Sequence, residues 1–244
     1  MSVRKKIAVI MAGGKGTRLK PYTTFVPKPL MPISDLPIIE VIIKQLKQYG
    51  FNEVIICVGH QAQLIQAFLG MGEKWGIKIS YSAEIEPLGT AGPLGLLKEK
   101  LTKYDVILSM NGDVLTTLNY EKALTHHLES NSTATICTNR RQVNIDFGVL
   151  ETDKEGNLAA YKEKPTIHYD VSMGINFFAP RALQSIPPGF YNIPDLMLQL
   201  VTEKQKVSCF NEDCYWLDIG RIEDYSLACE IFDQRRKEFL ADEN

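Results

Sequence analysis

Residues 7–33 read IAVIMAGGKGTRLKPYTTFVPKPLMPI, an apolar run followed at once by a loop rich in glycine, proline and positive charge. The run Ile7–Met11 is continuous and mostly aliphatic, which is typical of a strand buried on both faces. Three glycines follow it, at positions 13, 14 and 16. Because glycine tolerates sharp turns and close approach of the backbone to a ligand, the stretch predicts a buried strand that leads into a binding loop.

The loop matches neither of two common nucleotide motifs. A dinucleotide fingerprint needs a third glycine where Leu19 stands and a helix after it, and four prolines between residues 21 and 32 oppose that helix. The terminal Gly-Lys-Ser/Thr of a P-loop is also absent. The glycine N–H groups can still form an anion-binding nest, with positive charge added by Arg18 and Lys28. We interpret the loop as a triphosphate site, with a surface turn as the alternative.

Strand and helix patterns alternate after the loop. A helix is predicted from about residue 37, with Pro37 at its start and Gly50 suited to its C-terminal cap. This alternation favours a doubly wound, Rossmann-like α/β fold with a mostly parallel sheet between two helix layers. The other predicted elements up to residue 110 are strands at 53–58, 77–81 and 105–110 and helices at 61–69 and 90–101.

The second half is richer in strand patterns. Strands are predicted at 133–138, 148–151, 158–162 and 171–178, with a turn at Glu155-Gly156-Asn157 and a charged helix at 222–240. No linker, repeat or low-complexity segment divides the sequence. We therefore expect one domain over residues 1–244, with a nucleotide-binding half (1–113) and a β-rich sugar-phosphate-binding half (114–244).

Composition excludes several classes of partner. The 244 residues are 45% hydrophobic and carry a net charge of −2, so no global field favours nucleic acid or an anionic membrane. The five cysteines are odd in number and scattered, Cys57 fits a buried thiol, and the Cys209–Cys214 spacing is unusual for zinc. The apolar run 7–12 is too short for a signal peptide or a membrane span. We expect a cytoplasmic protein.

Several short blocks, taken together, resemble the sugar-1-phosphate nucleotidyltransferase family. The first are the glycine loop at 13–19 and Pro27-Lys28-Pro29-Leu30-Met31-Pro32. The others follow in the family's order: residues 84–92 (EIEPLGTAG), 111–113 (NGD), 147–149 (FGV), 163–165 (EKP) and 216–220 (WLDIG). The block at 84–92 looks most like mannose- and heptose-1-phosphate guanylyltransferases. Because the blocks span nearly the whole chain in order, the resemblance is specific.

The resemblance implies transfer of a nucleoside monophosphate from an NTP to a sugar 1-phosphate, releasing pyrophosphate and supplying an NDP-sugar for polysaccharide or glycoconjugate synthesis. It implies catalytic roles for Arg18, Lys28 and Asp113, and Mg²⁺ held by Asp113 and Asp218. Nucleotide contacts are implied for Ala12, Gly13, Gly14, Gly16, Thr17, Arg18, Lys28, Glu84, Gly89, Thr90 and Gly112. Sugar-phosphate contacts are implied for Gly148, Glu163, Lys164, Ser172 and Gly174. Similar enzymes commonly form dimers, so the resemblance is compatible with a homodimer.

Two positions depart from the family's common pattern. Ser172 stands where many members have asparagine, and its hydroxyl can still donate and accept hydrogen bonds but is shorter than an amide. Glu84 stands where thymidylyl and uridylyl members usually have glutamine. Since an ionised carboxylate only accepts hydrogen bonds, Glu84 suits the two adjacent N–H donors of guanine. We therefore expect GTP as donor, with CTP, UTP or dTTP as the alternatives.

Two other kinds of protein compete with this interpretation. A catalytically silent nucleotide-sugar sensor would lose a metal carboxylate or the basic loop, and both are present here. A glycosyltransferase of related fold usually carries Asp-x-Asp, whereas residue 111 is asparagine. The sequence also contains no hexapeptide-repeat region of the kind that forms a C-terminal β-helix in some members of the family.

Overall fold

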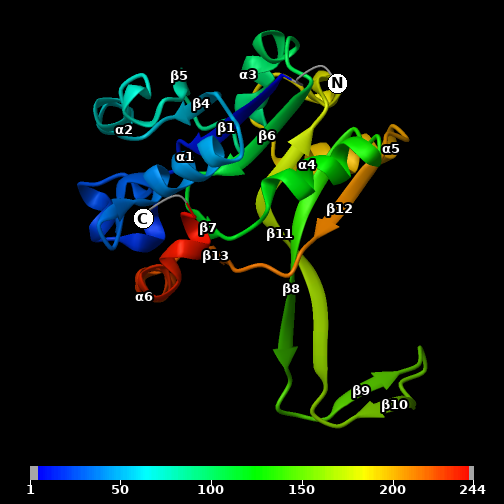
Figure 1. The fold of residues 1–244 in the computed structure, drawn as a ribbon. Helices are drawn as coiled ribbons and strands as arrows, with labels where there is room; N and C mark the ends of the chain where they lie inside the picture. Colours follow the sequence, from blue (N-terminus) through cyan, green and yellow to red (C-terminus); the bar gives the residue numbers. More distant parts are fainter. Residues whose placement is uncertain (1–4, 242–244) are drawn as a thin grey trace.

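A seven-stranded sheet runs through the centre of the protein (Figure 1). The structure is a computed structural model that describes residues 5–241. Six strands point the same way and β11 alone is antiparallel to its neighbours. The mostly parallel, Rossmann-like sheet predicted from the sequence is thereby confirmed. In sheet order the strands are β12 (Val207–Asn211), β8 (Ala134–Asn144), β11 (Thr166–Phe178), β6 (Val106–Asn111), β1 (Lys6–Ala12), β4 (Glu53–Val58) and β5 (Lys78–Ala83).

Helices cover both faces of the sheet. Ala8 and Ile10 of β1 face one core, while Ile7 and Val9 face the other, and all four are buried. This is why the strand is apolar without interruption. The first core packs against α1 (Ile38–Gln48), α2 (Ala62–Leu69), α4 (Tyr120–Glu129) and α6 (Ile222–Phe239), and the second against α3 (Gly92–Leu101) and α5 (Ile193–Thr202).

The helix ends predicted from proline and glycine are confirmed. Helix α1 begins directly after Pro37 and ends before Gly50, whose φ is +73° and whose N–H bonds to the Lys47 carbonyl at 2.9 Å. Helix α3 begins at Gly92 rather than Thr90, with Pro93 in its first turn. Proline therefore lies at or just before the first turn of α1 and α3, and glycine follows the end of α1, as the backbone preferences of these residues predict.

Helices α4 and α5 and the edge strand β12 were not predicted. Helix α4 has a clear start, because the Asn119 side chain accepts hydrogen bonds from the N–H groups of Glu121 and Lys122 at 3.0 Å. Helix α5 begins with Pro194 in its first turn. The capping asparagine and the first-turn proline can both be read from the sequence. The apolar residues that follow each of them repeat at helical spacing over too few turns to predict a helix.

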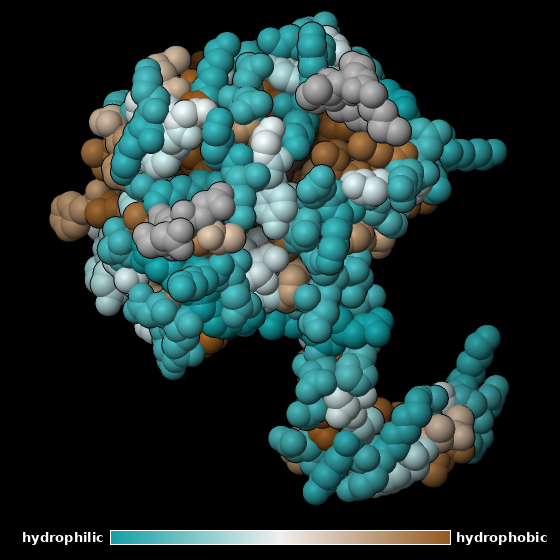
Figure 2. Space-filling model, viewed as in Figure 1, coloured by the Kyte–Doolittle hydropathy of each residue, from teal (hydrophilic) through white to brown (hydrophobic). Residues whose placement is uncertain are grey.

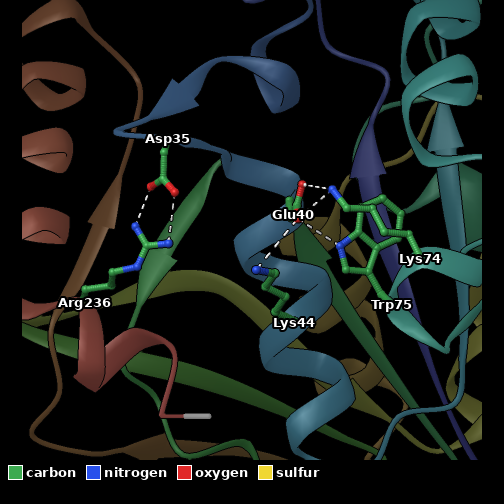
Figure 3. A network of polar contacts seen from close by, with 6 residues as sticks. All are labelled: Asp35, Glu40, Lys44, Lys74, Trp75 and Arg236. Carbon is green, nitrogen blue, oxygen red and sulfur yellow. Dashed lines mark hydrogen bonds and ion pairs between the residues drawn. The ribbon is translucent and has the colours of Figure 1, made fainter. Parts of the chain in front are cut away.

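Polar contacts fix the surface of α1 (Figure 3). Glu40 is buried in the first turn of this helix and accepts hydrogen bonds at 3.1 Å from Trp75 Nε1 and Lys74 Nζ. Trp75 and Lys74 belong to a short 3₁₀ helix, η4 (Glu73–Trp75). In the same view Arg236 of α6 pairs with Asp35 through both carboxylate oxygens. Among residues 5–241, no helix combines the length and the apolar character that crossing a membrane requires.

A long ribbon, which we call the arm (residues 139–172), projects from the sheet (Figure 1). The outer part of β8 pairs with the outer part of β11 down to Thr166↔Asn144. Beyond it lies a hairpin of β9 (Val149–Thr152) and β10 (Leu158–Lys162), turned at Gly156 as predicted. Strands β8 and β11 thus run well past their predicted bounds. Figure 2 shows the arm standing clear of the rest of the protein.

Candidate functional site

A cavity of about 430 Å³ lies at the carboxyl ends of β1 and β6. The chain leaves β1 toward β4 on one side and returns to β6 on the other, so this is where the strand order of the sheet reverses. Ligands of open α/β sheets bind at such a point. Every residue predicted to bind the nucleotide lines this cavity, from Ala12 in the glycine loop to Gly112 after β6.

The glycine loop is held in shape by its own backbone. Gly16 has φ +59° and starts a 3₁₀ helix, η1 (Thr17–Leu19), that carries Arg18. A Cβ at Gly16 would lie 3.0 Å from Thr23 Cγ2 and 3.3 Å from Lys28 Cβ. Thr23 Oγ1 also donates to the Gly16 carbonyl at 2.8 Å. Only glycine suits this position, which packs the loop against the segment that carries Lys28.

Two basic and two acidic side chains converge beside the loop. Strand β13 (Trp216–Asp218) pairs with β7 (Val114–Thr116) and sets Asp218 opposite Val114, next to Asp113. Lys28 Nζ donates to Asp113 Oδ2. A Cβ at Gly220 would lie 3.3 Å from both Arg18 Nη1 and Asp218 Oδ2, so these two side chains meet at Gly220. Residues from four separate parts of the sequence therefore form one charged cluster.

The acidic pair fits a divalent cation. Burial and the neighbouring Asp113 raise the pKa of Asp218, against the opposing charges of Lys28 and Arg18. Asp113 Oδ1 is buried without a hydrogen-bond partner among the described residues. No group of three or more His, Cys, Asp or Glu side chains suited to a metal occurs in residues 5–241. Two carboxylates match Mg²⁺, which leaves its other positions to phosphates and water.

Glu84 lies just beyond β5, in the same cavity. Its Oε2 accepts the Leu88 N–H at 3.1 Å, and its Oε1 lies 2.8 Å from where a Cβ on Gly13 would stand. Burial raises the pKa of this carboxyl, which the Leu88 N–H partly offsets. Glu84 is therefore a fixed acceptor against the glycine loop, where a bulkier residue than Gly13 would displace it.

A second chamber of about 270 Å³ adjoins the first and shares Thr90 and Asn111 with it. Ser172, Gly174 and Asp218, all predicted from the sequence, line this chamber. Gly174 has φ +71°, and a Cβ there would lie 2.6 Å from Asn111 Nδ2. The glycine thus lets the Asn111 amide lie against β11, and the two chambers meet at Asn111.

Sequence reasoning missed three polar side chains of the second chamber. Asn111 and Trp216 lie within blocks that were recognised for neighbouring residues, while Asn176 lies inside β11 with no motif around it. Trp216 Nε1 donates to the Met173 carbonyl at 3.0 Å, which fixes the indole as a wall. Asn176 Oδ1 is buried and has no hydrogen-bond partner among the described residues, so it is available to a ligand hydroxyl.

The remaining predicted sugar-phosphate residues lie on the arm and line neither chamber. A Cβ on Gly148 would come within 2.3 Å of Tyr161 Oη, so the tyrosine ring packs on this glycine. Tyr161 Oη donates to Glu163 Oε2 at 3.1 Å. Lys164 has φ +43° and forms no hydrogen bond or ion pair with the rest of residues 5–241. The structure therefore brings Gly148 and Glu163 together, but away from the cavity.

Comparison with known proteins identifies relatives over most of the chain. A family model described as nucleotidyl transferase matches residues 7–234. The chain is 33% identical over 236 residues to a UTP–glucose-1-phosphate uridylyltransferase from Synechocystis sp., covering 89% of this chain and 61% of that protein. It is 31% identical over 222 residues to the mannose-1-phosphate guanylyltransferase catalytic subunit beta of Dictyostelium discoideum, covering 89% and 62%. The chain thus spans about three fifths of the length of these curated relatives.

Two solved structures share the fold over most of the chain. The crystal structure of HddC from Yersinia pseudotuberculosis matches with a TM-score of 0.72 and 26% identity, over 93% of this chain and 99% of that one. A second structure of HddC, complexed with GMP-PN, matches with a TM-score of 0.72 and 25% identity over the same shares of the two chains.

Proposed function

The chain belongs to the nucleotidyl transferase family, and we propose that it transfers a nucleoside monophosphate from an NTP to a sugar 1-phosphate. The products are pyrophosphate and an NDP-sugar for polysaccharide or glycoconjugate synthesis. The observation that carries this proposal is the meeting of Arg18 and Lys28 with Asp113 and Asp218 beside two adjoining chambers. One chamber suits the nucleotide and the other suits the sugar.

Catalysis by this cluster would consist mainly of positioning and charge neutralisation. A phosphate oxygen of the sugar 1-phosphate attacks the α-phosphorus in line, and pyrophosphate leaves on the opposite side. The glycine-loop N–H groups and Arg18 bind the leaving phosphates, where negative charge develops. Lys28, which lines the same cavity, would add positive charge to the triphosphate site. Mg²⁺ held by Asp113 and Asp218 would neutralise further phosphate charge.

The Lys28–Asp113 pair also links nucleotide binding to the metal. The Lys28 ammonium group pairs with the Asp113 carboxylate. When phosphates enter, they offer Lys28 a second anion, which leaves the carboxylate to the cation. The metal and the triphosphate should therefore bind together better than either binds alone.

We further propose guanine as the preferred base. The Glu84 carboxylate accepts hydrogen bonds, and guanine offers N1–H and its exocyclic amine side by side. Uracil and thymine offer one N–H between two carbonyl oxygens, which would face the negative charge. The guanylyltransferase relative and the HddC structure complexed with GMP-PN support this choice, whereas the Synechocystis relative is a uridylyltransferase.

A comparison of turnover with GTP, CTP, UTP, dTTP and ATP at equal concentration tests the base. We expect GTP to be used best. Glu84→Gln should weaken its advantage by ~1–3 kcal/mol, about 5- to 150-fold, as for a lost bidentate base contact. Glu86→Gln is the matched control, since Glu86 is exposed on the same loop and lines neither chamber. A preference for another base in the unchanged protein would contradict the role of Glu84 and leave the reaction class intact.

A further inference from the structure

The arm is an extended surface without a core. Residues 139–172 include no buried residue. Ile167 and Val143 lie opposite each other on the ladder and are 46% and 44% exposed, and Tyr169, two residues from Ile167, shares their face. A two-stranded ribbon is marginally stable alone in water, and ordering its backbone costs ~1–2 kcal/mol per residue. The arm would therefore be more stable if another protein surface covered this apolar face.

The geometry of the arm keeps Lys164 away from its own site. The ladder is unbroken from Ser172↔Thr138 to Thr166↔Asn144. At ~3.3 Å per residue, the six residues from Ser172 to Thr166 span ~20 Å of extended strand, and Lys164 lies two residues beyond that end of β11. This distance is far more than the ~6 Å length of a lysine side chain. Since Ser172 lines the second chamber, Lys164 cannot reach that chamber while the ladder is intact.

The second chamber lacks the charge that its substrate needs. No lysine or arginine is among the described residues that line it, although a sugar 1-phosphate brings a dianion. Arg141 at the base of the arm is already engaged, because it donates to the Trp216 carbonyl at 3.2 Å and stacks on that ring. Lys164, by contrast, is exposed and unpaired among the described residues, in a backbone conformation (φ +43°) that non-glycine residues seldom adopt.

We propose that two copies of the chain exchange arms, so that Lys164 of one copy enters the sugar-phosphate chamber of the other. The inference rests on the proposed function. Two identical arms and two identical chambers allow a closed twofold dimer in which every chamber receives one arm. The partner then covers the apolar face around Ile167. The occupant is a second copy because Lys164, unpaired among residues 5–241, matches the anionic substrate that this same protein is proposed to bind.

Complementation between two impaired variants, assayed at a sugar 1-phosphate concentration well below the KM of Lys164→Ala, tests the exchange. Arg18→Ala disables the nucleotide chamber, while Lys164→Ala disables the arm. In co-expressed chains with different tags, random pairing gives about half heterodimers, each with one complete site. About a quarter of the unchanged protein's sites should therefore be active. If the arm serves its own chamber, or binds elsewhere, the mixture will show no more activity than the two variants measured apart.

Two controls separate this inference from the proposed function. The unchanged protein must release pyrophosphate; if it does not, the proposed function fails first. The double variant Arg18→Ala/Lys164→Ala, mixed equally with unchanged chains, should leave about a quarter of the sites active under exchange, but half if each site is built from one chain. Ile167→Lys, on the exposed arm face, should convert the dimer into a monomer, which light scattering would detect as half the molecular mass. An active protein that is monomeric at assay concentration overturns the proposal.

Discussion

Replacing Asp113 with asparagine removes the carboxylate that both holds Lys28 and faces Asp218. The Lys28 and Asp113 side chains are 10% and 24% exposed, so the ammonium group would lose its counter-ion at a position largely shielded from solvent. Breaking a fully buried pair costs ~3–5 kcal/mol and an exposed pair ~0–1 kcal/mol. With Asp113 a quarter exposed, we expect a loss of ~1–2 kcal/mol in the free energy of unfolding, which leaves the protein folded.

Turnover should suffer far more than stability. One of the two proposed metal ligands disappears, and the amide that replaces it brings no negative charge. We expect a fall of at least ~10²–10³-fold, the size of effect seen when one electrostatic stabiliser is removed. Metal-free nucleotide binding should survive or tighten, because Lys28 then has no competing anion. This separation distinguishes loss of the metal from loss of the pocket.

The assays are urea unfolding, pyrophosphate release, and nucleotide binding with and without Mg²⁺. Asp105→Asn is a suitable control, since Asp105 accepts the Lys5 N–H at 2.8 Å at the opposite end of the sheet. Near-normal turnover by folded Asp113→Asn protein would refute the metal role. Equal loss of turnover and of metal-free nucleotide binding would mean that Asp113 merely shapes the cavity.

Further outcomes follow from other parts of the structure. Lys164→Ala should raise KM for the sugar 1-phosphate more than KM for the nucleotide, whereas Arg18→Ala should lower kcat; steady-state kinetics with the reverse pattern would place the substrates at opposite ends. Glu40→Ala should lower the free energy of unfolding by ~1–3 kcal/mol, because the partly buried indole N–H of Trp75 loses its acceptor. An unchanged urea midpoint would show that this contact does not stabilise the fold. Burial, helped by Arg181, lowers the pKa of His127 from 6.5 to about 4, so the folded state binds fewer protons than the unfolded state. Stability should therefore decline from pH 6.5 toward 4, and a His127→Gln variant with the same decline would contradict this.

Much of the sheet could be predicted because its strands are buried on both faces. A continuous apolar run as short as Ile7–Met11 is typical of a buried strand, and Gly50 and Pro93 mark helix ends by their backbone chemistry. The nucleotide cavity was predictable for a similar reason. Glycines and cations in a loop after a buried strand have a direct chemical use, and the structure gathers them at one end of the sheet.

The arm could not be predicted because nothing local determines it. Its ladder includes exposed polar contacts such as Arg140–Asp170 and Thr166–Asn144, and none of residues 139–172 is buried, so no buried face marks the length of the arm in the sequence. The motif that contains Lys164 was recognised, but its distance from the cavity depends on how far β8 and β11 remain paired. Pairing over that length is a property of two strands together, so neither strand's sequence shows it.

The most direct test of the central claim is to identify the products formed from an NTP and a sugar 1-phosphate. The purified protein is incubated with Mg²⁺, each of the five nucleotides and a panel of sugar 1-phosphates, and both pyrophosphate and nucleotide sugar are quantified by mass spectrometry. The account predicts equimolar pyrophosphate and NDP-sugar, formed only when both substrates are present and most rapidly with GTP. Nucleotide breakdown that proceeds equally without any sugar 1-phosphate, or no product from any pair, would contradict it.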